Sequence, residues 1–392
     1  MSYFNLPKIN NLCNIHKIVL STAPVVPCVS YSLFNYYIQL REQIFLTTSE
    51  DSFNEETFED LIRIVNPCEY VFSYYDNLKC SVGKVCSVGK VCSVGKVCSV
   101  GKVCPITNLF YELTELVKTV DIFNDYKKQP LNLLHLTHNY DDCINCINLC
   151  RPNNLDKHVC YADTTVETIN LLSNYNYKFD FLYIDTNVYD ISKLNELNEY
   201  MDTLIRIILI IFKNMSTNGT CVLKIGAIFY KQIIEFIYIL SSAFDKTSIF
   251  KPFVSNPTSF DKYLICQNFM KDQTIQTKTT MENNCLILSD FLKNKNKNKN
   301  KNQLKIQSML DFDIPLNYMI KIVDINSLIG QQQIEYLNSI LNLLRNKNKC
   351  EKIIAYKKLG FQKSVLWCEK YKIPHNVCCD KTMTLDYFDE NN

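Results

Sequence analysis

Glycine is scarce in this chain of 392 residues, which contains only eight. Four of them lie in one repeated tract, and the other four are Gly219, Gly226, Gly330 and Gly360. No Gly-x-x-x-x-Gly-Lys-Ser/Thr frame follows a strand-like run, which excludes a phosphate-binding loop of that type. An excess of charge is also lacking. The formal net charge is only +2, so the overall charge does not indicate a nucleic-acid partner. Local basic patches could still bind one.

Long apolar runs are missing as well. The longest, Ile207–Phe212, is far shorter than the roughly 20 residues that a membrane-spanning helix needs. The first residues lack the charged and apolar regions of a secretory signal. In a chain without such a signal, 19 cysteines favour reduced thiols over a disulfide scaffold. These features predict a soluble, cytoplasmic protein with no membrane partner.

Two low-complexity tracts divide the chain. Residues 81–104 repeat Ser-Val-Gly-Lys-Val-Cys four times. We interpret this tract as a duplicated surface insertion rather than a metal site, because zinc sites usually use close cysteine pairs. The second tract, Lys293–Asn302, alternates Lys and Asn and is typical of a solvated linker. The predicted organisation is an N-terminal extension at 1–80, the insertion at 81–104, a central domain at 105–292, the linker at 293–302 and a helical, basic C-terminal extension at 303–392.

The central domain alternates strand-like and helix-like patterns. Apolar runs predict strands, and apolar residues at helical spacing predict helices between them. The expected strands are Leu131–Leu136, Val159–Ala162, Phe181–Ile184 and 221–225, and the helices are Asp141–Cys150, Thr164–Leu172, Leu194–Lys213 and 229–241, with a turn at 216–219. A final strand pair, about 247–251 and 262–268, is joined by a loop and is therefore expected to be antiparallel. This alternation predicts an α/β fold with a mostly parallel sheet and one reversed strand, flanked by helical N- and C-terminal extensions.

Charged residues follow several of these strands. Asp185 ends the run Phe-Asp-Phe-Leu-Tyr-Ile, Lys224 lies in Val-Leu-Lys-Ile-Gly, and Asp261 lies in Ser-Phe-Asp-Lys-Tyr. Lys251-Pro252 and Pro257-Thr258-Ser259 precede the last of them. In open α/β sheets, ligands bind beyond the carboxyl ends of the strands, so these side chains are candidate site residues.

This ordered set resembles the FtsJ/RrmJ-type RNA 2′-O-methyltransferases. The resemblance implies a Rossmann-like methyltransferase sheet, S-adenosylmethionine as cofactor, and RNA as partner, with the mRNA cap and an internal ribose both open as substrates. Such enzymes place a Lys-Asp-Lys-Glu tetrad around the ribose hydroxyl. Its Asp falls on Asp185, its second Lys, the base, on Lys224, and its Glu on Asp261. The resemblance further implies cofactor contacts from Leu136, Asn139 and Asp163, and RNA contacts from Lys251, Ser255, Asn256 and Ser259.

The chain departs from the family pattern in three places. These are the first tetrad lysine, the loop expected to approach the cofactor, and the strands expected to carry the cofactor-binding acids. Glu112 occupies the place of the first tetrad lysine. The loop His135–Cys143 contains no glycine, although close backbone approach to a ligand favours one, and Asp141 and Asp142 at the next helix start would repel the donor carboxylate. Asp163 is either the ribose-binding acid of the second strand or the acid after the third. Cofactor binding is therefore expected to be weak or absent, and the alternative function is a catalytically inactive relative that binds RNA or a protein partner.

Two further clusters have competing interpretations. Cys143, Cys146 and Cys150, with His158 and Cys160 nearby, could bind zinc, but their helical spacing favours burial in the core, so no metal is predicted. The C-terminal segment interleaves basic residues with aromatics, which indicates either an RNA surface or a helical extension that packs on the sheet. Its ending, Trp367–Pro374, looks like the tail of FtsJ-type proteins of large cytoplasmic DNA viruses, which would imply the host cytoplasm or the virion as its location.

Overall fold

The computed structural model describes residues 2–50, 55–72, 107–126, 129–152, 155–186, 194–270, 275–297, 304–345 and 349–373. The repeated tract at 81–104 lies outside these residues, so its interpretation as a surface insertion stays a prediction. Among the described residues, no helix is both long and apolar enough to cross a membrane.

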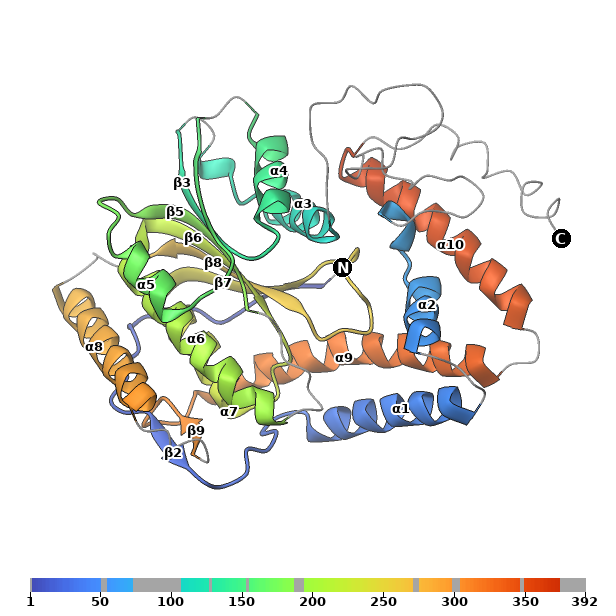
Figure 1. The fold of residues 1–392 in the computed structure, drawn as a ribbon, viewed down its shortest axis with the longest axis horizontal. Helices are drawn as coiled ribbons and strands as arrows, with labels where there is room; N and C mark the ends of the chain where they lie inside the picture. Colours follow the sequence, from blue (N-terminus) through green and yellow to red (C-terminus); the bar gives the residue numbers. More distant parts are fainter. Residues whose placement is uncertain are drawn as a thin grey trace.

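A seven-stranded sheet forms the centre of the molecule (Figure 1). Strands β4, β3, β5 and β6 run parallel, and β8 is antiparallel to both of its neighbours, β6 and β7. The predicted α/β fold with a reversed strand in a mostly parallel sheet is thus confirmed. In spatial order the strands are β1 (Ser2–Asn5), β7 (Phe244–Lys251), β8 (Lys262–Phe269), β6 (Met215–Ile225), β5 (Phe179–Asp185), β3 (Asn132–Leu136) and β4 (Lys157–Tyr161).

The seventh strand comes from the N-terminus, which the sequence placed in a separate extension. Strand β1 pairs antiparallel with β7, with Ser2 opposite Lys251 and Asn5 opposite Ser248. It therefore adds a second reversed strand and covers an edge that β7 would otherwise expose, where unpaired backbone groups invite aggregation. At the other edge, no strand lies beyond β4 in the described part of the chain.

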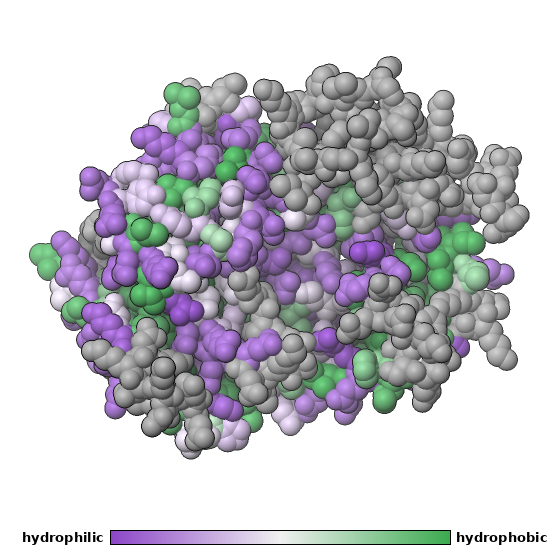
Figure 2. Space-filling model, viewed as in Figure 1, coloured by the Kyte–Doolittle hydropathy of each residue, from purple (hydrophilic) through white to green (hydrophobic). Residues whose placement is uncertain are grey.

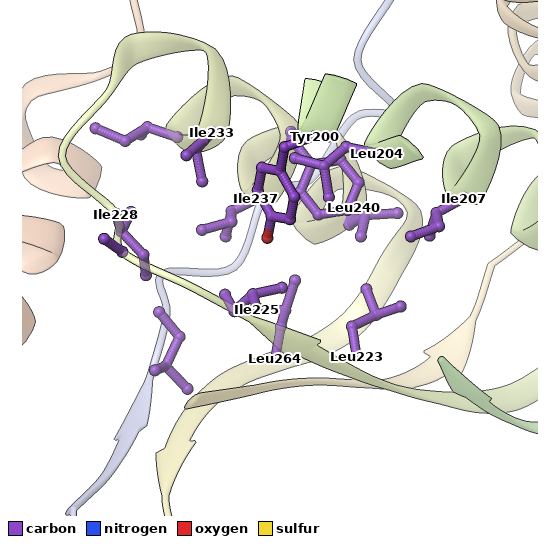
Figure 3. Close-up of a cluster of buried hydrophobic side chains, with 14 of the residues drawn as sticks. Tyr200, Leu204, Ile207, Leu223, Ile225, Ile228, Ile233, Ile237, Leu240 and Leu264 are labelled. Carbon is purple, nitrogen blue, oxygen red and sulfur yellow. The ribbon is translucent and has the colours of Figure 1, made fainter. Parts of the chain in front are cut away.

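Helices cover both faces of the sheet, and alternate side chains of each strand face the two layers. Leu182 and Ile184 belong to the larger apolar cluster, while Phe181 and Tyr183 belong to the other. The larger cluster lies under α5 (Val166–Leu172), α6 (Leu194–Asn214) and α7 (Lys231–Ala243), and the other under α3 (Leu109–Val120) and α4 (Tyr140–Cys150), with the short helix η2 (Asn124–Tyr126) nearby. Figure 3 shows α6 and α7 side chains such as Leu204 and Ile237 above Leu223 and Leu264 of the sheet.

The N- and C-terminal extensions pack against each other. Helix α1 contacts α9, helix α10 contacts α2 and η1, and strand β2 pairs antiparallel with β9 (Figure 1). Sequence segments more than 200 residues apart therefore pack together. The bounds are β2 (Val19–Ser21), α1 (Tyr31–Glu50), α2 (Glu55–Val65), η1 (Glu69–Val71), β9 (Lys305–Ser308), α9 (Leu316–Arg345) and α10 (Lys349–Lys370).

Two local predictions differ from the structure. Helix α8 (Ile275–Lys297) continues through the first half of the predicted Lys/Asn linker, because Leu288 and Leu292 anchor it to the core and Lys is a good helix former. The turn predicted at 216–219 lies within β6, where Asn218 has a φ of 63° and the register with β5 shifts. A Cβ at Gly219 would lie 2.9 Å from Ser216 O, so this irregular turn of the strand needs glycine.

The described surface is mainly hydrophilic on the face shown in Figure 2. Apolar residues on this face lie in several small groups between polar ones rather than in one broad patch. Single exposed apolar side chains of this kind are normal for a folded domain.

Candidate active site

Lys224 lies at the carboxyl edge of the sheet, next to two residues that face the same side. It is opposite Asp185 on the parallel strand β5 and opposite Tyr263 on β8. Neighbouring parallel strands end at the same edge, which is why two residues that follow separate apolar runs become partners. The structure thus brings Asp185 and Lys224 together as the sequence predicted.

Helix α3 adds a carboxylate to this row. Glu112 Oε2 lies 3.6 Å from Lys224 Nζ, and the Glu112 side chain is 9% exposed against 19% for Lys224. The hydroxyl of Tyr263 donates to the same Glu112 oxygen at 2.5 Å. Glu112 therefore binds the amine that the family resemblance assigns as the base. The sequence placed Glu112 at the first lysine position but gave no sign of this ion pair.

Negative charge dominates the surroundings of Lys224. The carboxylates of Glu112, Asp261 and Asp185 together raise the pKa of Lys224 above its ordinary value, with Glu112 as the largest cause, and they outweigh the opposing effect of burial. The candidate base is consequently an ammonium at neutral pH. A lysine must lose this proton before it accepts another from a hydroxyl.

A second hydrogen-bond network, which the sequence did not predict, lies at the ends of β5 and β6. Thr186 Oγ1 donates to the carbonyl of Lys224 at 2.6 Å and lies 3.2 Å from the hydroxyl of Tyr200. The backbone N–H of Gly226 donates to the same Tyr200 oxygen at 3.3 Å. Tyr200 belongs to α6, and Figure 3 shows its hydroxyl directed toward the sheet. This network holds the ends of β5 and β6 in one position.

Lys251, a predicted RNA contact, is buried instead at the end of β7. Its Nζ donates to the backbone carbonyls of Asn256 at 3.0 Å, Ser259 at 2.9 Å and Asp261 at 2.7 Å. Burial lowers the pKa of Lys251 to about 8. Because an ammonium has three hydrogens and all three are donated, Lys251 holds the 252–261 loop in shape rather than presenting its charge to a phosphate.

The other three predicted RNA contacts lie in this same loop. Ser255 is buried, and its hydroxyl donates to the carbonyl of Pro252, so it also supports the loop from inside. Asn256 is exposed and Ser259 is half-buried, with Ser259 Oγ accepting from the N–H of Asp261. Only Asn256 and Ser259 therefore remain at the loop surface as predicted contacts.

The turn after β3 carries the predicted cofactor contacts Leu136 and Asn139. Leu136 is buried at the end of β3, whereas His138, Asn139 and Tyr140 are exposed. Asn139 has a φ of −100°, and no residue of this turn has a positive φ, so its backbone needs no glycine. The exposed side chains nevertheless project where glycines would let a ligand approach the backbone.

The two acids at the start of α4 have different environments, which corrects the prediction that both repel a bound carboxylate. Asp142 is fully buried, and its Oδ2 accepts from the N–H and hydroxyl of Thr107. It thereby anchors the segment before α3. Only Asp141 is exposed.

Asp163 follows β4, which pairs with β3 at the sheet edge. Of the two alternatives, Asp163 therefore takes the position after the second strand. Its Oδ1 accepts from the N–H of Thr165 at 3.3 Å and the hydroxyl of Thr168 at 3.1 Å, and it thereby supports Thr165, the N-cap of α5. Its Oδ2 makes no hydrogen bond within the described residues and is exposed.

Two of the three cysteines of α4 lie in the core, and Cys150 is half-buried beside it. Cys143 and Cys146 are fully buried, and Thr114 donates to Cys146 Sγ at 3.5 Å. Across the described ranges, no group of three or more His, Cys, Asp or Glu side chains is arranged to hold a metal ion. His135 and His158 instead contact each other at 3.0 Å between ring nitrogens, and burial lowers the pKa of His135 to about 3.

The aromatics of the C-terminal segment pack inward. Phe361, Trp367 and Tyr371 are buried in the cluster that includes α3. The indole N–H of Trp367 donates to Glu115 Oε2 at 2.8 Å. The sequence left two alternatives for this segment, an RNA surface and a packed helical extension. The structure has the packed helical extension.

Three comparisons with known proteins bear on the family of this chain. The family model "FtsJ-like methyltransferase" matches residues 96–269. No curated protein matches the sequence. Among solved structures, the crystal structure of human Methyltransferase-like protein 13 in complex with SAH is similar, with 11% identity, a TM-score of 0.24, and coverage of 46% of this chain and 98% of that one. Residues 96–269 are accordingly identified as an FtsJ-like methyltransferase domain.

Proposed function

We propose that this domain transfers a methyl group from S-adenosylmethionine to the 2′-hydroxyl of an RNA ribose, in the cap or within the chain. The observation that carries the proposal is the row of Asp185 and Lys224 at the sheet edge, with Asp261 among the charges that act on Lys224. Once it has lost its own proton, an amine at this edge can accept the proton of a hydroxyl, and the flanking carboxylates then stabilise the ammonium that forms.

The polar groups at the ends of the first two strands decide how well S-adenosylmethionine fits this site. Asp163 offers an exposed Oδ2 at the end of the second strand, which fits the hydroxyls of a ribose, and Asn139 offers an exposed amide at the end of the first. These residues would hold S-adenosylmethionine, which supplies an electrophilic methyl group when bound. The exposed side chains of His138, Tyr140 and Asp141 oppose close contact, so the fit is a weak one.

Residues of this chain would take up the proton that the ribose hydroxyl loses. Lys224 Nζ, as the free amine, would accept the proton of the ribose hydroxyl, while Asp185 and Asp261 would stabilise the ammonium that forms. The Thr186–Tyr200 network keeps the Lys224 backbone in place. Because Glu112 already holds Lys224 protonated, turnover is expected to be slow at neutral pH and to rise with pH.

Lys224→Ala is expected to reduce methyl transfer at least about 100-fold, since a positioned general base contributes about 10²- to 10⁴-fold. Transfer is measured with labelled donor on capped and uncapped RNA at pH 9, where the free amine is more populated. Lys246→Ala, which removes an exposed lysine of β7, is the matched control and should keep its rate. Undiminished transfer in Lys224→Ala would exclude this residue as the base.

Cofactor affinity is expected to be poorer than micromolar, which corresponds to about −8 kcal/mol. Replacing His138 and Tyr140 with glycine, together with Asp141→Ala, should improve it at least about tenfold, because the changes remove exposed bulk and one repelling charge. Isothermal titration calorimetry measures both proteins. Asp142 is left unchanged because it anchors Thr107. Micromolar or tighter binding by the unaltered chain would refute the weak-site interpretation.

A second candidate function is favoured by the Glu112–Lys224 ion pair. A chain that has lost the base would retain the fold as a module that binds RNA or a protein partner without methyl transfer. The two candidates differ in one measurement: restored transfer after removal of the Glu112 charge supports the enzyme, and RNA binding without transfer in every variant supports the module.

A further inference from the structure

We propose that a groove between α5, α6 and α8 binds a small amphiphile that has an anionic head group and an apolar body, as a fatty acid does. The groove has a volume of about 630 Å³, which lies within the range of roughly 300–1,000 Å³ for small-molecule sites. Helix α6 contacts both α5 and α8, and Figure 1 shows these three helices along one side of the sheet. The inference does not depend on the proposed methyl transfer.

The groove lies at the edge of the sheet opposite to the candidate base. Its lining includes Lys178, which directly precedes β5, and Lys213 and Asn214, the last residues of α6 before β6. Asp185 and Lys224 lie at the carboxyl ends of these two strands. Because a strand rises about 3.3 Å per residue, the seven residues of β5 span about 20 Å. The groove is therefore a separate site.

Helix α8 supplies one wall of the groove. Its lining residues recur at three- and four-residue spacing, so they share one face of the helix. They are Lys278, Met281, Glu282, Cys285, Leu286 and Ser289. At a rise of 1.5 Å per residue, this stripe is about 16 Å long. The groove is consequently elongated, a shape that suits an extended chain.

Apolar side chains on both sides of the groove are accessible to a ligand. Leu286 is 62% exposed, and Cys285 is half-buried. Across the groove from α8, Ile169 of α5 and Tyr175 are half-buried, so part of their apolar surface faces solvent. A ligand that covered these side chains would remove apolar area from water, which favours binding.

Lysines give the groove a positive charge. Lys178, Lys213 and Lys278 are exposed, and Glu282 is the one carboxylate among the lining residues that the structure describes. Lys178 Nζ donates to the carbonyl of Lys213 at 2.5 Å, which brings both lysines to the end of α6. Cationic groups beside an apolar surface favour an anionic head joined to an apolar body over a neutral lipid or a free anion.

Isothermal titration calorimetry of the full chain tests the proposal with dodecanoate, kept below the concentration at which it forms micelles. Dodecyltrimethylammonium has the same apolar body with a cationic head, and acetate has the anionic head alone. We expect dodecanoate to bind saturably and acetate not to bind. The affinity for the cationic analogue should be at least about tenfold lower, because it makes no charged hydrogen bond with the lysines.

The head-group contacts are tested by Lys213→Ala/Lys278→Ala. This double variant should lower the dodecanoate affinity at least about tenfold, since hydrogen bonds between charged groups are lost. Lys246→Ala/Lys352→Ala removes two exposed lysines outside the groove and is the matched control, which should bind as the unaltered chain does.

The apolar contacts are tested by Leu286→Gln. It should lower the affinity at least about threefold, because it removes apolar surface that the ligand covers. Leu366→Gln changes a leucine of α10 that is 59% exposed and should leave the affinity unchanged. Both leucines are largely exposed, so the fold should tolerate the two changes.

The proposal is overturned if dodecanoate does not bind saturably, or if the cationic analogue binds equally well. Equal affinity in Lys213→Ala/Lys278→Ala and in its matched control would also overturn it, because the ligand would then adsorb without using the groove. Methyl transfer does not enter these measurements, so failure of the proposed reaction leaves this test intact.

Discussion

Glu112→Gln is expected to raise methyl transfer at pH 7 at least about tenfold. Glu112 is the largest cause of the raised pKa of Lys224, and its oxygen lies 3.6 Å from the amine. Two unit charges about 4 Å apart interact by about 4 kcal/mol at an effective dielectric of 20, and each pKa unit corresponds to about 1.36 kcal/mol. If Glu112→Gln removes only a third of that interaction, the pKa of Lys224 falls by about one unit. The free-amine fraction of Lys224 then rises about tenfold. Glutamine keeps an oxygen for the hydroxyl of Tyr263.

The pH profile gives the sign of this effect. Below its pKa, the free-amine fraction of Lys224 rises with pH, so the rate of the unaltered chain should rise through the alkaline range. Glu112→Gln should shift that rise to lower pH. Glu112→Lys, which restores the family's first lysine, should shift it further, because a neighbouring ammonium lowers the pKa of Lys224 instead of raising it.

Two controls accompany this experiment. Glu112→Asp keeps the charge and should recover far less activity than Glu112→Gln. Glu282→Gln removes an exposed carboxylate of α8 and should leave the rate unchanged. If Glu112→Gln and Glu112→Lys both stay as inactive as the unaltered chain while the RNA is still bound, the ion pair is not what limits catalysis and the binding-module function is favoured.

Glu115→Ala is expected to lower the free energy of unfolding by about 3 kcal/mol or more. The fully buried carboxylate accepts from the N–H groups of Phe253 and Val254 and from the indole of Trp367, so its removal leaves three donors without a partner. Each buried unsatisfied donor costs about 1–3 kcal/mol. Urea denaturation followed by circular dichroism measures the change and avoids the altered surroundings of the tryptophan.

Glu369→Ala is the matched control for stability. Glu369 is an exposed carboxylate of α10, and its loss should change the free energy of unfolding by no more than about 0.5 kcal/mol. A loss below about 1 kcal/mol in Glu115→Ala would mean that α3, the loop and α10 do not depend on this junction.

The local sequence pattern was sufficient to predict the helices and strands of the central domain. It also predicted that two of the site residues would lie at the same edge of the sheet. Apolar runs and helical spacing encode which face of each element is buried, and that information lies within a few residues of sequence. Parallel strands joined by helices end at one edge, so the positions of Asp185 and Lys224 after two such runs already implied that they would meet. The helical spacing of Cys143 and Cys146 likewise indicated that both pack in the core.

Tertiary structure alone decided which groups meet across long separations. Ser2–Asn5 carries no distinctive pattern, and only the open edge of β7 makes it a strand. Lys251 has the charge of a surface residue, yet three backbone carbonyls satisfy it in the interior. Glu112 and Lys224 are 112 positions apart, and their ion pair depends on how α3 packs over the sheet. Periodicity specifies burial, whereas a side chain's partner is set by contacts that no local stretch of sequence contains.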